Sequence, residues 1–269
     1  MKKIVCIAAI ALGCIAPLSA ATGLLALKKE KVAAIEGPQI KVLLEADVTS
    51  ALLEVRGGYR VERGDNGALL SSGKRAKRFR VHALQEGLRW GEEYPNIYHV
   101  VVRPTKQETD VYVNGIQYKG AVSVYYKSNQ HITVVNEVGI EDFLKSVLSM
   151  QFDCPMSKEA LSAMVIMART EIYEQIKSGG RLFHLTADEV NYLGYGVTRQ
   201  GCGVDAAVDA TKFMVVEHSY QENWDQSLLQ AEQAEDLASH GLDASQILRT
   251  IYPKTSMGLT THPARKMVR

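Results

Sequence analysis

One nearly continuous apolar helix constrains how this chain of 269 residues can fold. The pattern over Lys158–Lys177 is helical, and Ala160–Ala168 is apolar almost without interruption. A helix this apolar is buried on most sides, so we expect it at the centre of the fold. Ser157 is a favourable N-cap for it. Its methionines are expected to fill the core rather than to hold a cofactor.

A second helical signal lies just before this helix. Apolar residues recur there at the spacing of one helix face, at Ile140, Phe143, Leu144, Val147 and Leu148. Gln151–Pro155 interrupts the pattern. We therefore predict consecutive helices at about 140–149 and 157–178. The loop between them, Met150–Ser157, is where a functional site is expected first.

The N-terminal half has the pattern of short strands separated by turn residues. The predicted strands are Ile40–Ala46, Leu52–Arg56, Tyr59–Glu62, Phe79–Leu84, Tyr98–Arg103, Val111–Val113, Gly120–Tyr126 and Ile132–Val135. Gly57-Gly58 predicts a hairpin between the second and third of these, and Asn114-Gly115 predicts another hairpin turn. The fold class is therefore α+β, with a β-rich N-terminal half packed on a helical core centred on the two consecutive helices.

The remaining segments complete the expected organisation. A short helix at 204–211, a strand at 213–217 and helices at 227–240 and 245–252 follow the central pair. Residues 258–269 are basic without periodicity, so we expect disorder there. We predict a segment at 22–38 that is a linker or short helix, then a domain at 39–257, with its β-rich part at about 40–135 and its helical core at about 136–257.

Residues 1–21 follow the pattern of an export signal. Lys2 and Lys3 precede an apolar run, and small residues end the segment. Cleavage after Ala20 or Ala21 is the expected outcome, with a retained membrane anchor or a lipidated Cys14 as alternatives. In each case we expect the protein to be exported to the periplasm or cell envelope.

The charge and the cysteine content argue against some classes of protein and of site. The formal net charge of +1 argues against a general nucleic-acid-binding protein. A basic run, Lys74–Arg80, is either a solvated edge or a contact for a polyanion. Cys154 and Cys202 either form one disulfide in an oxidising compartment or stay unpaired. Their spacing is not a metal-binding pattern.

The central block resembles the stage II sporulation protein D (SpoIID) / LytB family. The residues that carry the resemblance are Val134–Glu137, Ile140–Leu144, Glu159–Leu161 and Ala168-Arg169-Thr170, with weaker matches at Asp205–Thr211 and Gln246–Pro253. The family resemblance implies a cell-envelope protein that acts on peptidoglycan glycan strands in cell division or wall remodelling. Its members are lytic transglycosylases or amidase enhancers.

The catalytic acid implied by this resemblance is replaced here. The family places a glutamate eight residues before the position of Glu159, and this chain has Gln151 there. A glutamine amide accepts and donates hydrogen bonds but has no proton to give to a leaving group. Asp153 is either a substitute acid or a solvated loop residue. The protein is therefore either an enzyme with a rearranged site or a glycan-binding protein that activates a partner amidase.

Three further residues are candidates for substrate binding. Arg169, inside an apolar helix, needs either an ion pair with Glu137, Glu141 or Asp142, or an exit to a groove that holds glycan. Tyr192 and Tyr195 are either stacking surfaces for sugar rings or packing anchors. The long metal-bearing segment typical of the family is missing, so we expect no metal and no cofactor, and His218 is expected at the surface.

Overall fold

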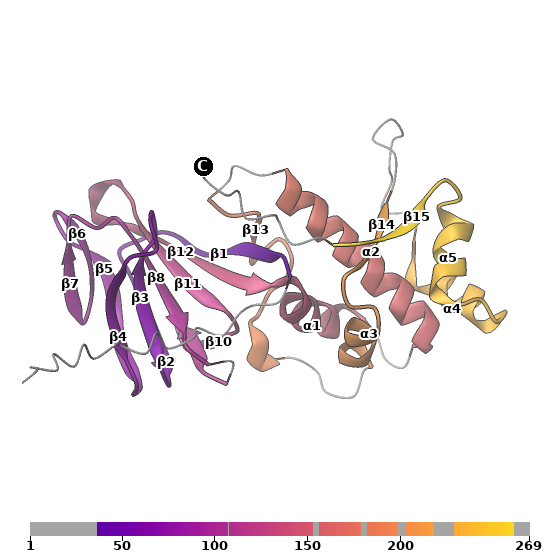
Figure 1. Cartoon of the computed structure of the whole chain (residues 1–269), viewed down its shortest axis with the longest axis horizontal. Helices are drawn as coiled ribbons and strands as arrows, with labels where there is room; N and C mark the ends of the chain where they lie inside the picture. Colours follow the sequence, from indigo (N-terminus) through magenta and orange to yellow (C-terminus); the bar gives the residue numbers. More distant parts are fainter. Residues whose placement is uncertain are drawn as a thin grey trace, which may run out of the picture. The chain divides into compact units, whose positions relative to one another are not determined.

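The computed structural model describes residues 37–106, 108–152, 156–178, 182–197, 203–217 and 229–260. All of them belong to one contact unit, Lys31–Arg269. Within these ranges the fold is α+β, as predicted (Figure 1). The expected signal segment, the linker up to residue 36, and the positions Asp153, Cys154, Cys202 and His218 lie outside the described residues.

Seven strands form the first sheet, and all pairs are antiparallel except the parallel pair of β13 with β1. In spatial order the sheet contains β13 (Leu185–Thr186), β1 (Gln39–Val48), β12 (Ile132–Gly139), β11 (Ala121–Tyr126), β8 (His99–Pro104), β3 (Tyr59–Arg63) and β4 (Leu69–Gly73).

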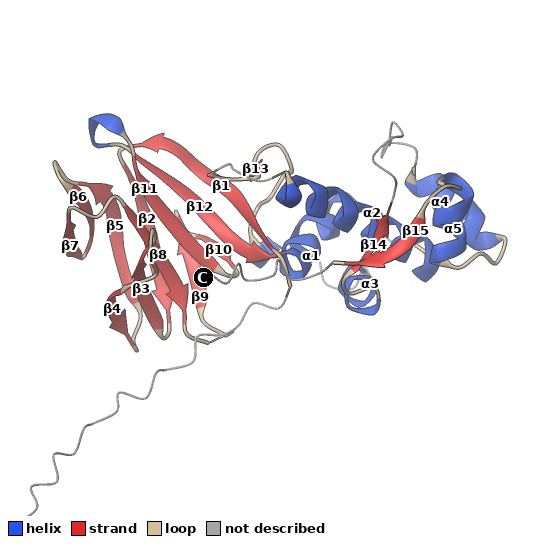
Figure 2. Cartoon of the chain, turned by 45° about the horizontal axis from the view of Figure 1, so that its top comes forward, coloured by secondary structure: helices blue, strands red, loops and turns tan. Residues whose placement is uncertain are grey.

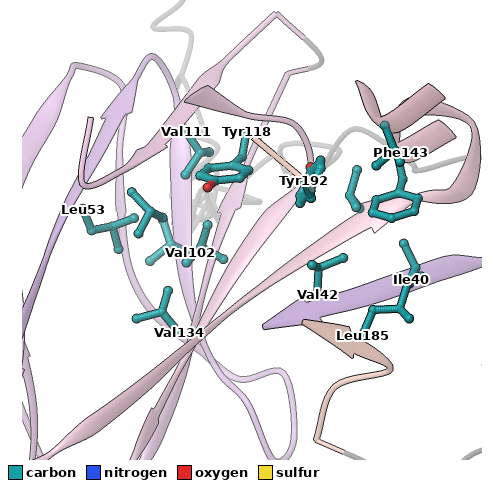
Figure 3. Packing of buried hydrophobic residues seen from close by; sticks show 14 of the residues in the cluster. Ile40, Val42, Leu53, Val102, Val111, Tyr118, Val134, Phe143, Leu185 and Tyr192 are labelled. Atoms are coloured by element: carbon teal, nitrogen blue, oxygen red, sulfur yellow. The ribbon is translucent and has the colours of Figure 1, made fainter. Parts of the chain in front are cut away.

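Six strands form the second sheet, which is antiparallel throughout. Its order is β10 (Ile116–Tyr118), β9 (Asp110–Val113), β2 (Ser50–Arg56), β5 (Lys77–Ala83), β6 (Gly87–Trp90) and β7 (Glu92–Pro95). Alternate residues of both sheets are buried in one cluster, as expected when two half-apolar sheets cover each other. Figure 3 shows Leu53 and Val111 of this sheet near Val102 and Val134 of the other.

The helices surround α2 (Lys158–Lys177), which the sequence pattern predicted with nearly these bounds. Along the chain, α1 (Ile140–Gln151) precedes α2, and α3 (Val204–Ala210), α4 (Ala231–Ser239) and α5 (Ala244–Ile251) follow it (Figure 2). The predicted α1–α2 pair is confirmed. None of the helices in the described ranges is both long and apolar enough to cross a membrane.

The apolar character of α2 follows from its position between two separate clusters of buried side chains. Leu161, Val165 and Ile172 join the cluster that the two sheets also form. The opposite side of α2 packs against β14 (Met214–Glu217), α4 and α5 through Ala160, Ala163, Ile166 and Met167. Two buried faces leave little of this helix for solvent, as expected for a helix at the centre of the fold.

The predicted hairpin between Leu52–Arg56 and Tyr59–Glu62 is wrong. β2 pairs with β5 and β9, whereas β3 pairs with β4 and β8 in the other sheet. Gly57 has φ +146°, which L side chains rarely adopt, and the chain passes there from one sheet to the other. A glycine pair thus marks a corner of the sandwich here. The predicted turn at Asn114-Gly115 is confirmed and joins β9 to β10.

The expectation of disorder from residue 258 is wrong for Gly258 and Leu259. Both belong to β15 (Ser256–Leu259), which pairs antiparallel with β14. Backbone hydrogen bonds to β14 order this segment although its side chains show no periodicity. Residues 261–269 lie outside the described residues.

Candidate functional site

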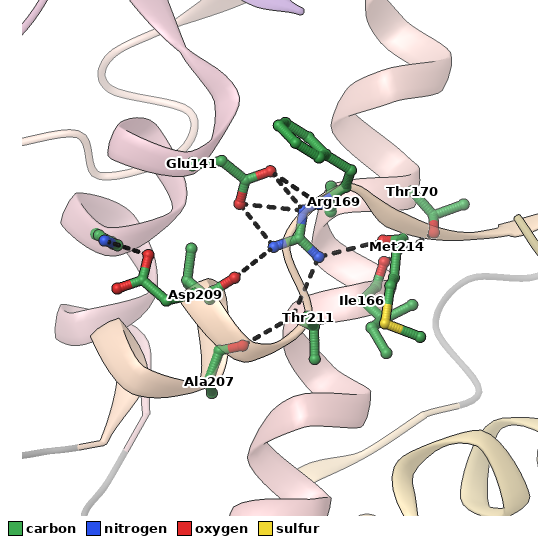
Figure 4. Close-up of polar contacts among 11 residues, drawn as sticks. Glu141, Ile166, Arg169, Thr170, Ala207, Asp209, Thr211 and Met214 are labelled. Carbon is green, nitrogen blue, oxygen red and sulfur yellow. Dashed lines mark hydrogen bonds and ion pairs between the residues drawn. The ribbon is translucent and has the colours of Figure 1, made fainter. Parts of the chain in front are cut away.

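Arg169 forms a buried ion pair that joins the two central helices. Its side chain is 0% exposed, and its Nη2 lies 2.7 Å from Oε2 of Glu141 in the first turn of α1. Its Nε donates to Oε1 of the same carboxylate at 3.0 Å (Figure 4). The predicted ion pair is thus confirmed with Glu141 rather than with Glu137, whose carboxylate lies 3.6 Å from Arg103.

The other N–H groups of Arg169 bind α3 and the segment that follows it. Nη1 donates to the hydroxyl of Thr211 at 3.3 Å and to the carbonyl of Met214 at 3.1 Å. Nη2 also donates to the carbonyl of Val208 at 3.3 Å. A guanidinium has five N–H donors, and all of them have acceptors here. Arg169 therefore ties α1, α2, α3 and β14 together, and in this structure no donor remains for a glycan.

The two candidate tyrosines lie in different environments. Tyr192 is 3% exposed and packs between Tyr118 and Phe143, with ring centroids 5.5 and 5.1 Å away (Figure 3). Burial raises the pKa of Tyr192 well above its ordinary value. Tyr195 is half-buried in the 3-10 turn Tyr195–Val197, and the Nζ of Lys119 lies 4.6 Å from its ring centroid. Of the two, Tyr195 is the one with surface for a ligand.

The segment before and after residues 153–155 is fixed by specific contacts. Gln151, the last residue of α1, is exposed. The side chain of Phe152 is 9% exposed, and its N–H donates to the carbonyl of Leu148 at 3.2 Å. On the other side, the N–H of Ser157 donates to both carboxylate oxygens of Glu235 on α4, at 2.9 and 3.2 Å. The predicted loop is thus held at both ends.

The comparison with protein families matches the block that contains α1, α2, α3 and β14. The family model SpoIID, described as Stage II sporulation protein, matches residues 128–220. An uncharacterized protein of Chlamydia pneumoniae is 43% identical over 218 residues, which cover 80% of this chain and 79% of that protein. The chain belongs to the SpoIID family. Membership of the SpoIID family indicates a cell-wall-related role.

Two further relatives are similar to the chain. An uncharacterized protein of Chlamydia muridarum is 42% identical to the chain over 217 residues, covering 80% of this chain and 75% of its own length. An uncharacterized protein of Brachyspira hyodysenteriae is 32% identical over 105 residues, which cover 38% of this chain and 28% of that protein. No solved structure matches the chain.

Two polar residues of the SpoIID block have structural roles that the sequence did not show. Asn136 is 0% exposed, and its amide donates to the carbonyls of Lys119 and Ala121 while its oxygen accepts from the Tyr192 hydroxyl. The carboxylate of Glu159 accepts from the N–H of Ala244, the first residue of α5, at 3.0 Å. Sequence position alone gave no signal for these partners, because each lies far away along the chain.

Asp142 is a half-buried carboxyl next to this framework. Burial raises its pKa, and the nearby ammonium groups of Lys119 and Lys145 oppose the shift. Lys145 itself forms an ion pair with Asp209 at 2.7 Å. The structure therefore places Asp142 where its charged form is disfavoured, at the opposite end of α1 from Gln151.

We expect Asp142→Asn to change how stability depends on pH. An acid whose pKa is higher in the folded than in the unfolded chain makes stability fall as pH rises through the interval between the two pKa values. The free energy of unfolding of Asp142→Asn should therefore equal that of the native chain below the unfolded pKa of about 3.9 and exceed it above the interval. Urea unfolding between about pH 3 and 7 measures this. A difference that stays constant with pH would contradict it.

Among the described residues, no three His, Cys, Asp or Glu side chains come together in a way that could hold a metal ion. The possible disulfide between Cys154 and Cys202 falls outside these residues and stays a prediction.

Proposed function

We propose that the chain acts on the glycan strands of peptidoglycan at Met150–Ser157, which contains the end of α1 and the connection to α2. The observation that carries this proposal is the fixing of the loop at both ends, by Phe152 against Leu148 and by Ser157 against Glu235. Functional groups are commonly presented by a short loop on a rigid scaffold. The Glu141–Arg169 pair supplies that scaffold by joining α1 to α2.

Cleavage of a glycan strand at this loop needs a carboxylic acid. The acid protonates the glycosidic oxygen and then acts as a base toward the sugar's own 6-hydroxyl, which closes an anhydro ring. Gln151, at the position of the family glutamate, is exposed but has no proton to give. We assign the acid role to Asp153, two residues along the chain from Gln151, the last residue of α1.

The amide at Gln151 favours a second candidate function. A chain that kept the SpoIID framework and lost its acid would bind glycan strands without cleaving them, or would activate a partner amidase. Exposed amides hydrogen-bond sugar hydroxyls without any change of protonation. The two candidates differ in one measurable property, which is the release of cleaved sugar.

The decisive experiment incubates the purified chain with glycan strands that lack stem peptides and measures the release of saccharides that end in an anhydro sugar. For the first candidate, the native chain releases product, and Asp153→Asn lowers the rate by on the order of a hundredfold or more. Glu232→Gln, at an exposed carboxylate on α4, is the matched control and should leave the rate unchanged.

The second candidate predicts a different pattern. The native chain would retain glycan strands in a pull-down without releasing product, and Gln151→Glu would gain release because it restores an acid at the family position. This pattern would rule out Asp153 as a working acid. Absence of both release and retention would contradict both cleavage and binding of glycan strands by this chain.

A further inference from the structure

The basic run that begins at Lys74 becomes part of an outward-facing array of cations. Alternate residues of a strand point to opposite faces of a sheet. On β5, Val81 and Ala83 are buried against the other sheet, so Arg78, Arg80 and His82 lie on the outer face. Arg78 and Arg80 are both exposed, and both belong to the part of the basic run that forms β5.

Neighbouring strands extend this array. Glu54 of β2 lies opposite Arg78, which places Arg56 on the same outer face, and Arg89 of β6 lies opposite His82. The side chains of Arg56, Arg78 and Arg89 are 55%, 66% and 48% exposed. We call the cations of this surface, with the two exposed residues of the preceding turn, the arginine face: Arg56, Lys74, Arg75, Arg78, Arg80 and Arg89.

Carboxylates neutralise only part of the arginine face. Glu54 is shared between Arg56 at 2.5 Å and Arg78 at 3.5 Å, so one negative charge serves two guanidinium groups. Arg89 lies 3.7 Å from Glu93. Arg80 donates to the hydroxyl of Ser50 at 3.3 Å and forms no ion pair with any described residue.

The third carboxylate near the face, Asp110, accepts a hydrogen bond from Gln117 at 2.7 Å. Six cations against these three carboxylates and the exposed Glu86 of the turn before β6 leave an excess of positive charge, although the whole chain carries a net charge of only +1. The surface is therefore a local concentration of cations, and an anionic partner would complement it.

One exposed aromatic side chain of β5 lies on the opposite face of the strand from these cations. Phe79, between Arg78 and Arg80 in the sequence, is 51% exposed. The pairing of β6 with β5 covers only Val81–Ala83, so this neighbour does not reach the first half of β5. Phe79 alternates with the two arginines and lies on the same face of β5 as Val81, so it is not part of the arginine face.

We propose that the arginine face docks on a bilayer surface that carries anionic phospholipid headgroups. Guanidinium groups bind phosphate in a bidentate manner. The cations are spread over β2, β5 and β6, so they form a two-dimensional array that fits a plane of headgroups better than a single linear polyanion. Charges on a sheet edge also prevent edge-to-edge association, but that role does not require arginines on three adjacent strands.

The test measures sedimentation of the full chain with vesicles of phosphatidylcholine alone and of phosphatidylcholine with phosphatidylglycerol at about 3:1. We expect tighter binding to the anionic vesicles, weakened when salt rises from about 0.1 to 0.5 M. Each arginine near an anionic surface contributes about fivefold in affinity, so Arg78→Gln/Arg80→Gln should lower binding to anionic vesicles about 25-fold.

The matched control is Lys127→Gln/Arg249→Gln, which removes two exposed charges elsewhere and should retain native binding. All variants keep the N-terminal segment, so its own affinity for lipid cancels in the comparison. Equal binding to both vesicle types, or equal losses in both double variants, would overturn the proposal. The proposal would also be overturned if Arg78→Gln/Arg80→Gln lost binding to soluble polyphosphate but kept binding to vesicles. That result would assign the arginine face to a linear polyanion.

Discussion

Glu141→Gln is expected to lower the free energy of unfolding by about 3–5 kcal/mol, because it leaves a buried guanidinium without its counter-charge. Arg169 is 0% exposed and has no solvent to replace the lost carboxylate. The neutral amide also presents N–H groups toward a cation that only donates hydrogen bonds. The loss should appear as a lower urea midpoint with little change in slope.

Two comparisons isolate the ion pair from other effects of this substitution. The double variant Arg169→Met/Glu141→Leu removes both charges. We expect its loss in the free energy of unfolding to be smaller, by about 1–3 kcal/mol, than the sum of the losses for Arg169→Met alone and Glu141→Leu alone. Glu174→Gln breaks the exposed Glu174–Lys177 pair on the same α2 helix and should cost less than about 0.5 kcal/mol. If Glu141→Gln and Glu174→Gln lowered the free energy of unfolding by similar amounts, burial would not strengthen the ion pair between Arg169 and Glu141.

Asn136→Ala is the second substitution with a large expected effect. Asn136 satisfies the carbonyls of Lys119 and Ala121 and the hydroxyl of Tyr192 at 2.9, 3.0 and 2.9 Å. Each buried polar group left without a partner costs about 1–3 kcal/mol. With three groups affected, we expect a loss of about 3–5 kcal/mol in the free energy of unfolding.

Tyr192→Phe is the matched comparison for Asn136→Ala. It removes one hydroxyl from the same network while keeping the ring between Tyr118 and Phe143. The expected loss is about 1–1.5 kcal/mol, since the amide of Asn136 keeps its two carbonyl partners. Urea unfolding of both variants measures the difference. A larger loss for Tyr192→Phe than for Asn136→Ala would contradict this account of the network.

Local periodicity predicted the central helices well and the strand pairing poorly. The i, i+3, i+4 spacing from Ile140 and the N-cap at Ser157 depend only on neighbouring residues, and α1 and α2 begin close to where those signals lie. Strand partners are set by distant segments. Gly57-Gly58 therefore had the composition of a hairpin turn but lies at a change of sheet.

The candidate site shows the same division between local and distant information. A buried arginine in an apolar helix predicts a carboxylate partner, and the choice of Glu141 was among the alternatives that the sequence offered. The carbonyl partners of Arg169 and the contact of Glu235 with Ser157 could not be predicted, since they depend on how α3, α4 and β14 fold back on α2. The same is true of the burial of Tyr192.

The two buried faces of α2 have a consequence for the chain as it is synthesised. The side of α2 that contains Ile166 is covered by residues of 214–252, which leave the ribosome after the helix itself. Until they emerge, we expect a nascent chain that already contains the sheets to expose an apolar helix face. Such a chain is a substrate for chaperones that hold unfolded proteins, and truncation before α4 should make it aggregate.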